Sequence, residues 1–167
     1  MRISPENIVG LAADELIDFV ATQCYKPDNH DLLESQDFAL LPDYVRHMIF
    51  ILRFETEYEM EGIFTLLQNS TGQYLPQTID SFSQTDNIEI AECLTQIMVL
   101  LTSRELSVFE MRKRQEAGNE FDVIPTGDVA DDEVLTDEIA RVDEQLRPLI
   151  EGKGFWQNVE RKIKEKR

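Results

Sequence analysis

The chain has 167 residues, of which 33 are acidic and 16 basic, so its formal net charge at pH 7 is −17. A surface with this charge repels nucleic acids and acidic membranes and attracts basic partners, which argues against direct nucleic-acid or membrane binding. No apolar run approaches the roughly 18 residues of a membrane-spanning helix, and the N-terminus lacks the basic and apolar segments of a signal peptide. We therefore expect a cytoplasmic protein in which Cys24 and Cys93 are reduced thiols.

The basic residues are concentrated at the C-terminal end. Six of the 16 lysines and arginines, but two of the 33 acidic residues, lie in residues 152–167; residues 1–151 therefore hold 31 acidic and 10 basic residues, a net charge of −21. We interpret the chain as a single acidic domain, residues 1–167, with a basic tail from about residue 152. The tail is either a solvated end or a segment that folds back on an acidic face and helps the chain to dimerise.

A first helix is predicted from Ser4 to about Gln23, because a serine cap, a proline at the first helical position and an acid in the first turn favour a helix start. The residues at helical spacing that we expect to face the core are Val9, Ala12, Leu16, Phe19 and Val20. The other side of this helix carries an acidic cluster without a local basic residue, formed by Asp14, Glu15 and Asp18.

The connector that follows, residues 24–40, is acidic and contains turn-forming residues. Its acids are Asp28, Asp31, Glu34 and Asp37. A short helix over residues 31–38 is compatible with the pattern. The spacing of the acids lacks the glycine and the terminal glutamate of a calcium-binding loop, so we predict no metal site here.

The longest predicted helix spans about residues 42–69 and organises the rest of the chain. Its apolar stripe at helical spacing consists of Val45, Ile49, Leu52, Met60, Ile63 and Leu67, and a second, aromatic stripe consists of Phe50, Phe54 and Tyr58. A helix that is apolar on more than one side is usually buried in the middle of a domain. The same helix holds four glutamates within residues 55–61, so either negative charge is needed nearby or some of these glutamates have buried partners.

The remaining segments also favour helices. We predict helices over about residues 74–82, 87–102, 104–117 and 132–150 and a last amphipathic helix from Phe155 into the basic tail, with an extended or irregular segment over residues 121–127. The densest acidic run, residues 128–133, precedes the helix at 132–150. No segment alternates strictly between apolar and polar residues as a strand would. The fold class is therefore all-α, a compact helical bundle around the long central helix.

No catalytic pattern is present. The chain has no phosphate-binding glycine loop, no HExxH and no GxSxG, and its two histidines, His30 and His47, lie in unrelated contexts. With 33 carboxylates in the chain, a pair of them is uninformative. We therefore expect a protein that is not an enzyme and needs no cofactor.

Segment 57–69 resembles a motif of an uncharacterised bacterial all-α family, to which Glu57, Gly62 and Asn69 correspond. In size, acidity and its N-terminal and central segments, the whole chain resembles the family of the nineteen-kilodalton neisserial DNA-mimic protein. The resemblance implies a helical and dimeric protein that occupies the DNA-binding surface of a transcription regulator, with a helix-turn-helix dimer as the expected partner. As a motif residue, Glu57 is expected to be buried and hydrogen-bonded near Asn69.

Carboxylates can imitate phosphates, because both accept paired hydrogen bonds from arginine, and half or more of the contacts of a DNA-binding protein go to the DNA backbone. We predict that the mimic surface consists of the acids of the first helix, the connector and the last acidic segment: Asp14, Glu15, Asp18, Asp28, Asp31, Glu34, Asp37, Asp128, Asp131, Asp132, Asp137 and Glu138.

Two other functions remain open. An immunity or adaptor protein that neutralises a basic toxin such as a nuclease would use the same acidic surface. An enzyme would require a polar pocket, which a ligand-sized cavity lined by Glu57, Asn69 and His47 would support.

Overall fold

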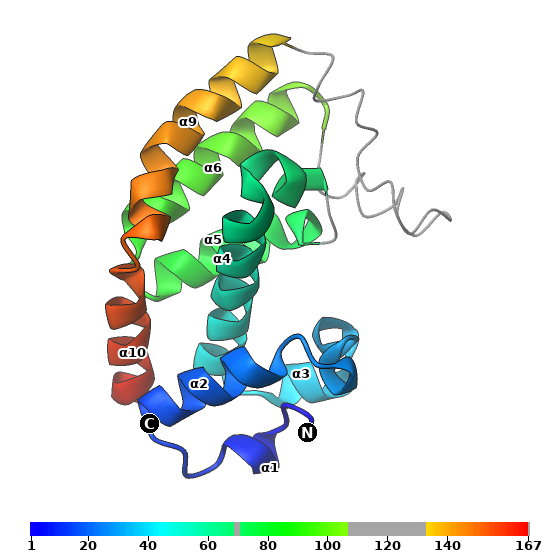
Figure 1. Cartoon of the computed structure of the whole chain (residues 1–167), viewed down its shortest axis with the longest axis vertical. Coiled ribbons are helices and arrows are strands. Elements are labelled where there is room, and N and C mark those ends of the chain that lie inside the picture. The colour runs from blue at the N-terminus through cyan, green and yellow to red at the C-terminus, as the bar shows by residue number, and fades with distance from the viewer. Residues whose placement is uncertain (69–70, 107–132, 167) are drawn as a thin grey trace.

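The computed structural model describes residues 1–68, 71–106 and 133–166, and all regular structure within these ranges is helical (Figure 1). This confirms the predicted all-α class. The α-helices are α1 (Pro5–Ile8), α2 (Ala13–Gln23), α3 (Gln36–Leu40), α4 (Asp43–Gln68), α5 (Leu75–Gln84), α6 (Ile88–Ser103), α9 (Glu133–Glu151) and α10 (Phe155–Lys166). Short 3-10 turns occur at Pro27–Asn29, Leu32–Glu34 and Gly72–Tyr74.

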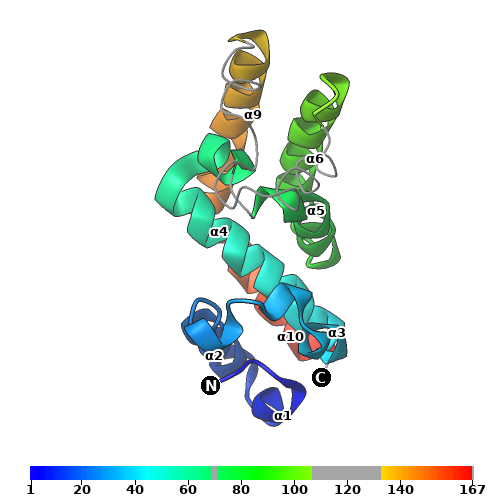
Figure 2. The same ribbon diagram turned by 90° about the vertical axis from the view of Figure 1, so that its right-hand side faces the viewer.

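Helix α4 runs through the middle of the molecule and connects its two ends (Figures 1 and 2), as the sequence predicted. Helices α2, α5, α9 and α10 all pack against it. The prediction that Met60 faces the core was wrong, because its side chain is 73% exposed. Beyond Leu52 the buried side of α4 is the one that carries Phe54 and Tyr58, and Met60 lies on the opposite side of the helix.

The predicted first helix is two helices, α1 and α2, separated by residues 9–12. Gly10 has a φ of +86°, a conformation that glycine adopts easily and that prevents α1 from continuing into α2. Val9 was expected in the core but is 79% exposed, since it belongs to this break. Leu16 and Val20 are buried as predicted.

Helices α6 and α9 lie side by side in the upper half of Figure 1, and α5 packs against α6 and α4. The core between α6 and α9 is aliphatic, and its members are Ile90, Leu94, Ile97, Leu101, Leu135, Ile139, Val142, Leu146 and Ile150. On α9, Asp143 is buried, with 6% of its surface exposed. Its carboxylate accepts hydrogen bonds from Tyr58 Oη of α4 at 2.5 Å and from Arg147 at 2.6 Å.

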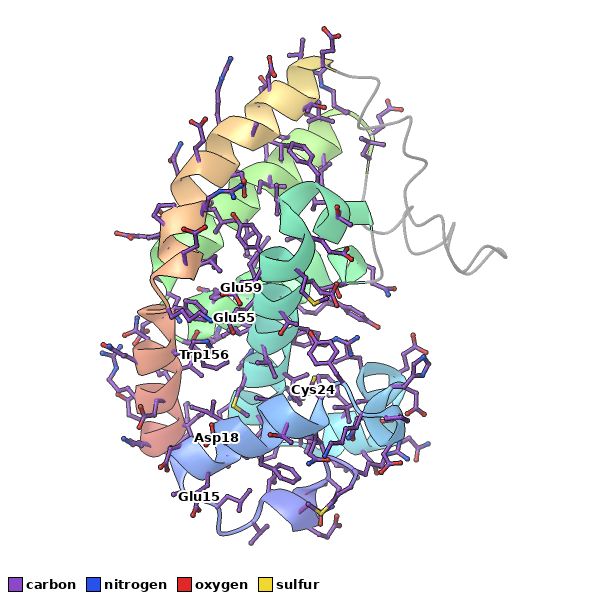
Figure 3. The ribbon with its side chains drawn as sticks, in the orientation of Figure 1. Glu15, Asp18, Cys24, Glu55, Glu59 and Trp156 are labelled. Carbon is purple, nitrogen blue, oxygen red and sulfur yellow. The ribbon has the colours of Figure 1, made fainter. Side chains whose placement is uncertain are left out.

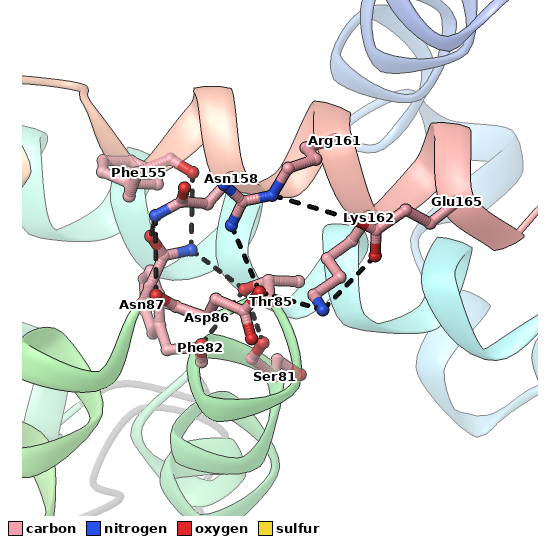
Figure 4. A network of polar contacts seen from close by, with 10 residues as sticks. All are labelled: Ser81, Phe82, Thr85, Asp86, Asn87, Phe155, Asn158, Arg161, Lys162 and Glu165. Carbon is pink, nitrogen blue, oxygen red and sulfur yellow. Dashed lines mark hydrogen bonds and ion pairs between the residues drawn. The ribbon is translucent and has the colours of Figure 1, made fainter.

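Helix α10 continues from α9 along the left edge of Figure 1 and packs against α2 and α4. Phe155, Val159 and Ile163 are buried, so the basic tail folds back on the acidic part of the molecule. Figure 4 shows its polar contacts with the turn between α5 and α6. Arg161 and Lys162 pair with Asp86 at 3.1 and 2.9 Å.

Beneath these ion pairs, the side-chain amide of Asn87 is buried. Its Nδ2 donates to Thr85 Oγ1 at 2.9 Å and to the carbonyl oxygen of Phe155 at 3.4 Å, and its Oδ1 accepts from Asn158 at 2.8 Å (Figure 4). The predicted helix at 104–117, the extended segment at 121–127 and the acidic run at 128–132 lie outside the described residues, apart from residues 104–106.

Candidate functional site

The outer face of α9 carries a row of exposed carboxylates, which we call the acidic row: Glu133, Asp137, Glu144 and Glu151. At 3.6 residues per turn these four lie within about 40° of one another and opposite the buried stripe of α9, and at 1.5 Å per residue they span about 27 Å. Among the described residues, no basic side chain lies within ion-pair distance of any of them. The negative charge of the row is therefore available to an external partner.

The immediate surroundings of the acidic row add to its charge. Glu138 lies beside the row on α9, half-buried, with its carboxylate 4.0 Å from Arg104. On the neighbouring helix α6, Glu89 and Glu92 are exposed. Of the two arginines on α9, Arg147 is bound to Asp143. Arg141 lines a groove between α6 and α9.

The acids of the connector, in contrast, are largely neutralised within the chain. The N-terminal amino group pairs with Asp28 at 2.8 Å, and Arg2 pairs with Asp37 at 2.9 Å and lies 3.8 Å from Asp31. The hydrogen bond from the amino group and its charge lower the pKa of the Asp28 carboxyl. Glu34 is exposed, and no ion pair joins it to a described residue.

The cluster on α2 is exposed as predicted, and Figure 3 shows two of its members, Glu15 and Asp18. Glu15 accepts a hydrogen bond from the backbone N–H of Ala12 at 2.8 Å, which caps the start of α2. Asp14 and Asp18 form no ion pair within the described residues. The cluster lies near α10, the most basic helix of the described chain, so its field is partly compensated.

Within α4, the glutamate with the buried carboxylate is Glu55 (Figure 3). Trp156 Nε1 of α10 donates to its two carboxylate oxygens at 2.9 and 3.0 Å, and Lys153 Nζ lies 3.6 Å from Glu55 and 3.0 Å from Glu59. Burial raises the pKa of Glu55, although Trp156 and Lys153 oppose the shift. Glu55 is thus a buried glutamate with two partners, but these partners are not themselves buried as expected, because Trp156 is half-buried and Lys153 is exposed.

The three motif residues that the resemblance indicated, Glu57, Gly62 and Asn69, do not form one site within the described residues. The prediction that Glu57 is buried was wrong, because its side chain is half-buried, and the buried glutamate is Glu55, two residues earlier. Gly62 interrupts the helical geometry of α4 with φ 74° and ψ 176°. Asn69 lies outside the described residues, so the hydrogen bonding of Glu57 near Asn69 stays a prediction.

Most of the predicted surface acids that the structure describes lie in three places. The acidic row includes Asp137, with Glu138 beside it. Helix α2 carries Asp14, Glu15 and Asp18, and the N-terminal amino group and Arg2 bind Asp28, Asp31 and Asp37. Asp128, Asp131 and Asp132 lie outside the described residues. The predicted mimic surface did not include Glu133, Glu144 and Glu151. The seven-residue spacing of Asp137, Glu144 and Glu151 is the pattern that could have revealed them, since residues seven apart share one face of a helix.

The cavity that would favour an enzyme is not lined by the expected residues. A groove of about 1080 Å³ contains His47, but Glu57 is not among its lining residues. Within residues 1–68, 71–106 and 133–166, no group of three or more histidine, cysteine, aspartate or glutamate side chains is arranged to hold a metal ion. In the same ranges, no helix combines the length and apolar character needed to cross a membrane.

A protein-family model described as DMP19-like protein matches residues 39–160, from α3 into α10. The matched segment includes α4, the acidic row and the contact between Glu55 and Trp156. No curated protein and no solved structure matches the chain.

Proposed function

The chain belongs to the DMP19-like protein family, and from this membership together with the acidic row we propose that it is a DNA-mimic protein. In this proposal its carboxylates occupy the DNA-binding surface of a basic protein and prevent that protein from binding DNA. The expected partner is a transcription regulator of the helix-turn-helix type, which the protein would meet in the cytoplasm. The protein acts by binding alone, as a homodimer and without catalysis or a cofactor.

The observation that carries the proposal is the unpaired acidic row on α9, a helix whose opposite side is packed into the core. One DNA strand carries a charge every 3.4 Å along the helix axis, so the roughly 27 Å of the row corresponds to about eight phosphates. With Glu89 and Glu92, the α6–α9 pair exposes six carboxylates, and the half-buried Glu138 is a seventh. This number is comparable to the roughly six to ten phosphate contacts of a typical DNA-binding protein.

Rigidity supports the same conclusion. The apolar core between α6 and α9 fixes the backbone of the acidic row, and the buried Asp143 ties α9 to α4 through Tyr58. A surface that is already ordered loses less entropy on binding than a flexible acidic tail does. Ordered carboxylates can therefore compete with DNA, whose phosphates are also held in a regular array.

The proposal is tested with two variants that each remove three negative charges. In the first, the acidic-row variant, Glu133→Gln, Asp137→Asn and Glu144→Gln neutralise three of the four acids of the acidic row. In the control, Asp28→Asn, Asp31→Asn and Asp37→Asn remove acids that are paired within the chain. The partner is captured from a bacterial lysate on the wild-type protein at low salt, eluted with salt, identified, and tested for competition with its DNA in a gel shift.

We expect the wild-type protein and the connector variant to displace the DNA and the acidic-row variant to lose at least about tenfold in potency. The reason is that each lost charge–charge contact to a basic surface weakens binding and its salt dependence. If the captured protein is a nuclease inhibited at its active site, the immunity reading replaces mimicry. Equal potency of all three proteins would place the binding surface elsewhere.

A further inference from the structure

A groove lies between the connector, α3, the first half of α4 and α5, away from the acidic row. Its aromatic lining consists of three rings in contact: the centroids of Phe38 and Phe50 are 5.5 Å apart, and those of Phe50 and Tyr74 are 5.8 Å apart. All three side chains are half-buried, so part of each ring is accessible from the groove. At about 1080 Å³, the groove is large enough for a long side chain and the backbone that carries it.

The tautomer of His47, which also lines the groove, follows from its neighbours. The hydroxyl of Ser81 donates its one proton to the carbonyl oxygen of Gln77 at 2.7 Å. Ser81 Oγ must therefore accept in its 3.1 Å contact with His47 Nδ1, so Nδ1 carries the hydrogen. Burial lowers the pKa of His47 despite the nearby carboxylate of Asp80, so the ring is neutral at pH 7. Its Nε2 atom is then a hydrogen-bond acceptor.

Carboxylates line the same groove. Asp80, whose side chain is 59% exposed, lies 4.0 Å from His47 Nδ1 and accepts a 3.4 Å hydrogen bond from Gln84. Glu34 is exposed on the connector side of the groove. Asp43 is paired with Arg46 at 2.5 Å, so these two cancel. With His47 neutral, the groove holds a net charge of about −2 from Asp80 and Glu34.

We propose that this groove binds an arginine side chain of the protein partner. The inference rests on the proposed function, because it assumes that the partner presents the arginines of a DNA-binding surface. A guanidinium group is planar, always charged and a donor only, with five N–H groups. It stacks on aromatic faces and donates to carboxylates and to an imidazole nitrogen, and the groove offers all three.

The groove and the acidic row make different demands on a partner. Exposed carboxylates attract any cation in proportion to its charge, whereas aromatic faces beside fixed acceptors favour the planar guanidinium over the compact ammonium of lysine. The acidic row therefore supplies attraction, and the groove supplies a preference for arginine at one point of the interface.

The test uses two probes of equal charge, N-acetyl-arginine amide and N-acetyl-lysine amide, titrated into the full chain. Proton NMR follows the ring signals of His47, and the exposed His30 serves as an internal reference for changes in pH and ionic strength. We expect a saturable shift of the His47 signals, with the arginine probe binding about two- to fivefold more tightly than the lysine probe. The His30 signals should shift little and without saturation.

Two variants assign the site. Asp80→Asn removes an exposed carboxylate of the groove and should weaken binding of the arginine probe about two- to fivefold, the size expected for a solvent-exposed ion pair. Glu61→Gln on α4 removes the same charge from an exposed position away from the groove and should leave the affinity unchanged. Equal affinity for both probes, the same loss in both variants, or no saturable shift would overturn the inference.

The outcome is separable from that of the proposed function. If the arginine probe fails to bind while the acidic-row variant still loses competition with DNA, the groove is not part of the interface and mimicry stands. If the probe binds but Asp80→Asn competes with DNA as well as the wild type does, the inference that the partner supplies the arginine is wrong.

Discussion

Glu55 places a titratable carboxyl at the contact between α4 and α10. Burial raises its pKa above the ordinary value of 4.5, so the folded protein holds this proton more tightly than the unfolded chain. The resulting stabilisation is fully present below about pH 4.5 and is lost as the pH rises through the raised pKa. Since glutamine does not ionise, we expect Glu55→Gln to gain stability relative to the wild type between about pH 4 and pH 7.

Urea unfolding followed by circular dichroism over that pH range measures the difference. The control is Glu59→Gln, which removes the other carboxylate that contacts Lys153 but from an exposed position. A stability difference between Glu55→Gln and the wild type that does not change with pH would contradict the assignment of Glu55 as the buried carboxyl.

Asp143 is also buried, with 6% of its surface exposed, but both Tyr58 and Arg147 donate hydrogen bonds to its carboxylate. Asp143→Ala should lower the free energy of unfolding by about 1–3 kcal/mol, because it leaves the buried Tyr58 Oη without its acceptor, whereas the lost pair with the exposed Arg147 adds little. Tyr58→Phe should cost about 0.5–1.5 kcal/mol. The double variant should lose less stability than the sum of the two single losses, because the two side chains interact. A loss equal to that sum would show that they do not interact.

Local sequence did not predict which carboxylates are buried. Glu55, Glu57, Glu59 and Glu61 look alike in the sequence, and Glu57 was favoured through the family resemblance. Burial of Glu55 depends on Trp156, which is 101 residues away, and burial of Asp143 depends on Tyr58, which is 85 residues away. Partners at such separations cannot be read from helical periodicity.

At the scale of the helices, Gly62 controls the course of α4. Its φ of 74° and ψ of 176° fall in a region that is accessible essentially to glycine alone. No heavy atom of another residue would lie within 4 Å of an added Cβ, so the cost of a side chain is purely conformational. We expect Gly62→Ala to lower the free energy of unfolding by about 1–3 kcal/mol in chemical denaturation.

The matched control is Gly154→Ala between α9 and α10, where a Cβ also meets no atom within 4 Å and φ is not positive. This variant should be neutral or stabilising by up to about 1 kcal/mol. If Gly62→Ala is as stable as the control, α4 does not require the glycine-specific conformation.

Two kinds of contact attach α10 to the turn between α5 and α6, namely the surface ion pairs of Asp86 and the hydrogen bonds of the buried Asn87. Variants of the two residues can show which kind contributes more to stability. Asp86→Asn should lower the melting temperature only slightly, because its pairs with Arg161 and Lys162 lie at the surface and asparagine tolerates the positive φ of 59°. Asn87→Ala should cost about 1–3 kcal/mol, because it leaves buried partners on α10 unsatisfied. Thermal unfolding of both variants measures this order, and the reverse order would mean that the ion pairs hold α10.

The helices of this chain were predictable from the sequence where an apolar stripe is long. The breaks between helices were not predictable in this way. The stripes of α4, α6, α9 and α10 each extend over several turns, so their existence and approximate bounds followed from periodicity. The division between α1 and α2 was missed because Val9 and Ala12 fit the stripe of a continuous helix, although Gly10 ends it. Met60 was misplaced because the buried side of α4 changes with the helices that pack against it.

For the whole molecule, a net charge of −17 means that the folded state carries substantial self-repulsion. Raising the salt concentration from about 0.01 M to about 0.1 M shortens the screening length from about 30 Å to about 10 Å, which weakens this repulsion more than it weakens close ion pairs. We expect the melting temperature to rise over this range. The rise should be smaller in the acidic-row variant, and a melting temperature that falls with salt would show that ion pairs dominate.

The candidate surface was predictable in kind but not in position. Net charge and family resemblance indicated an acidic surface, and the proposed members included the acids of α2, those of the connector, and Asp137 and Glu138 of α9. Which of them remain unpaired depends on where Arg2, the N-terminal amino group and α10 fold back, and that is a property of the tertiary structure.

The position of α10 also determines when the protein can finish folding during its synthesis. A ribosome adds about 5–20 residues per second, so Glu55 emerges roughly 5–20 s before Trp156 is made. Until then the nascent chain up to residue 151 carries a charge of −21, and the core surface that Phe155, Val159 and Ile163 cover is open. The native state is therefore reached only after the last helix has been translated, and in that interval the open surface is accessible to chaperones.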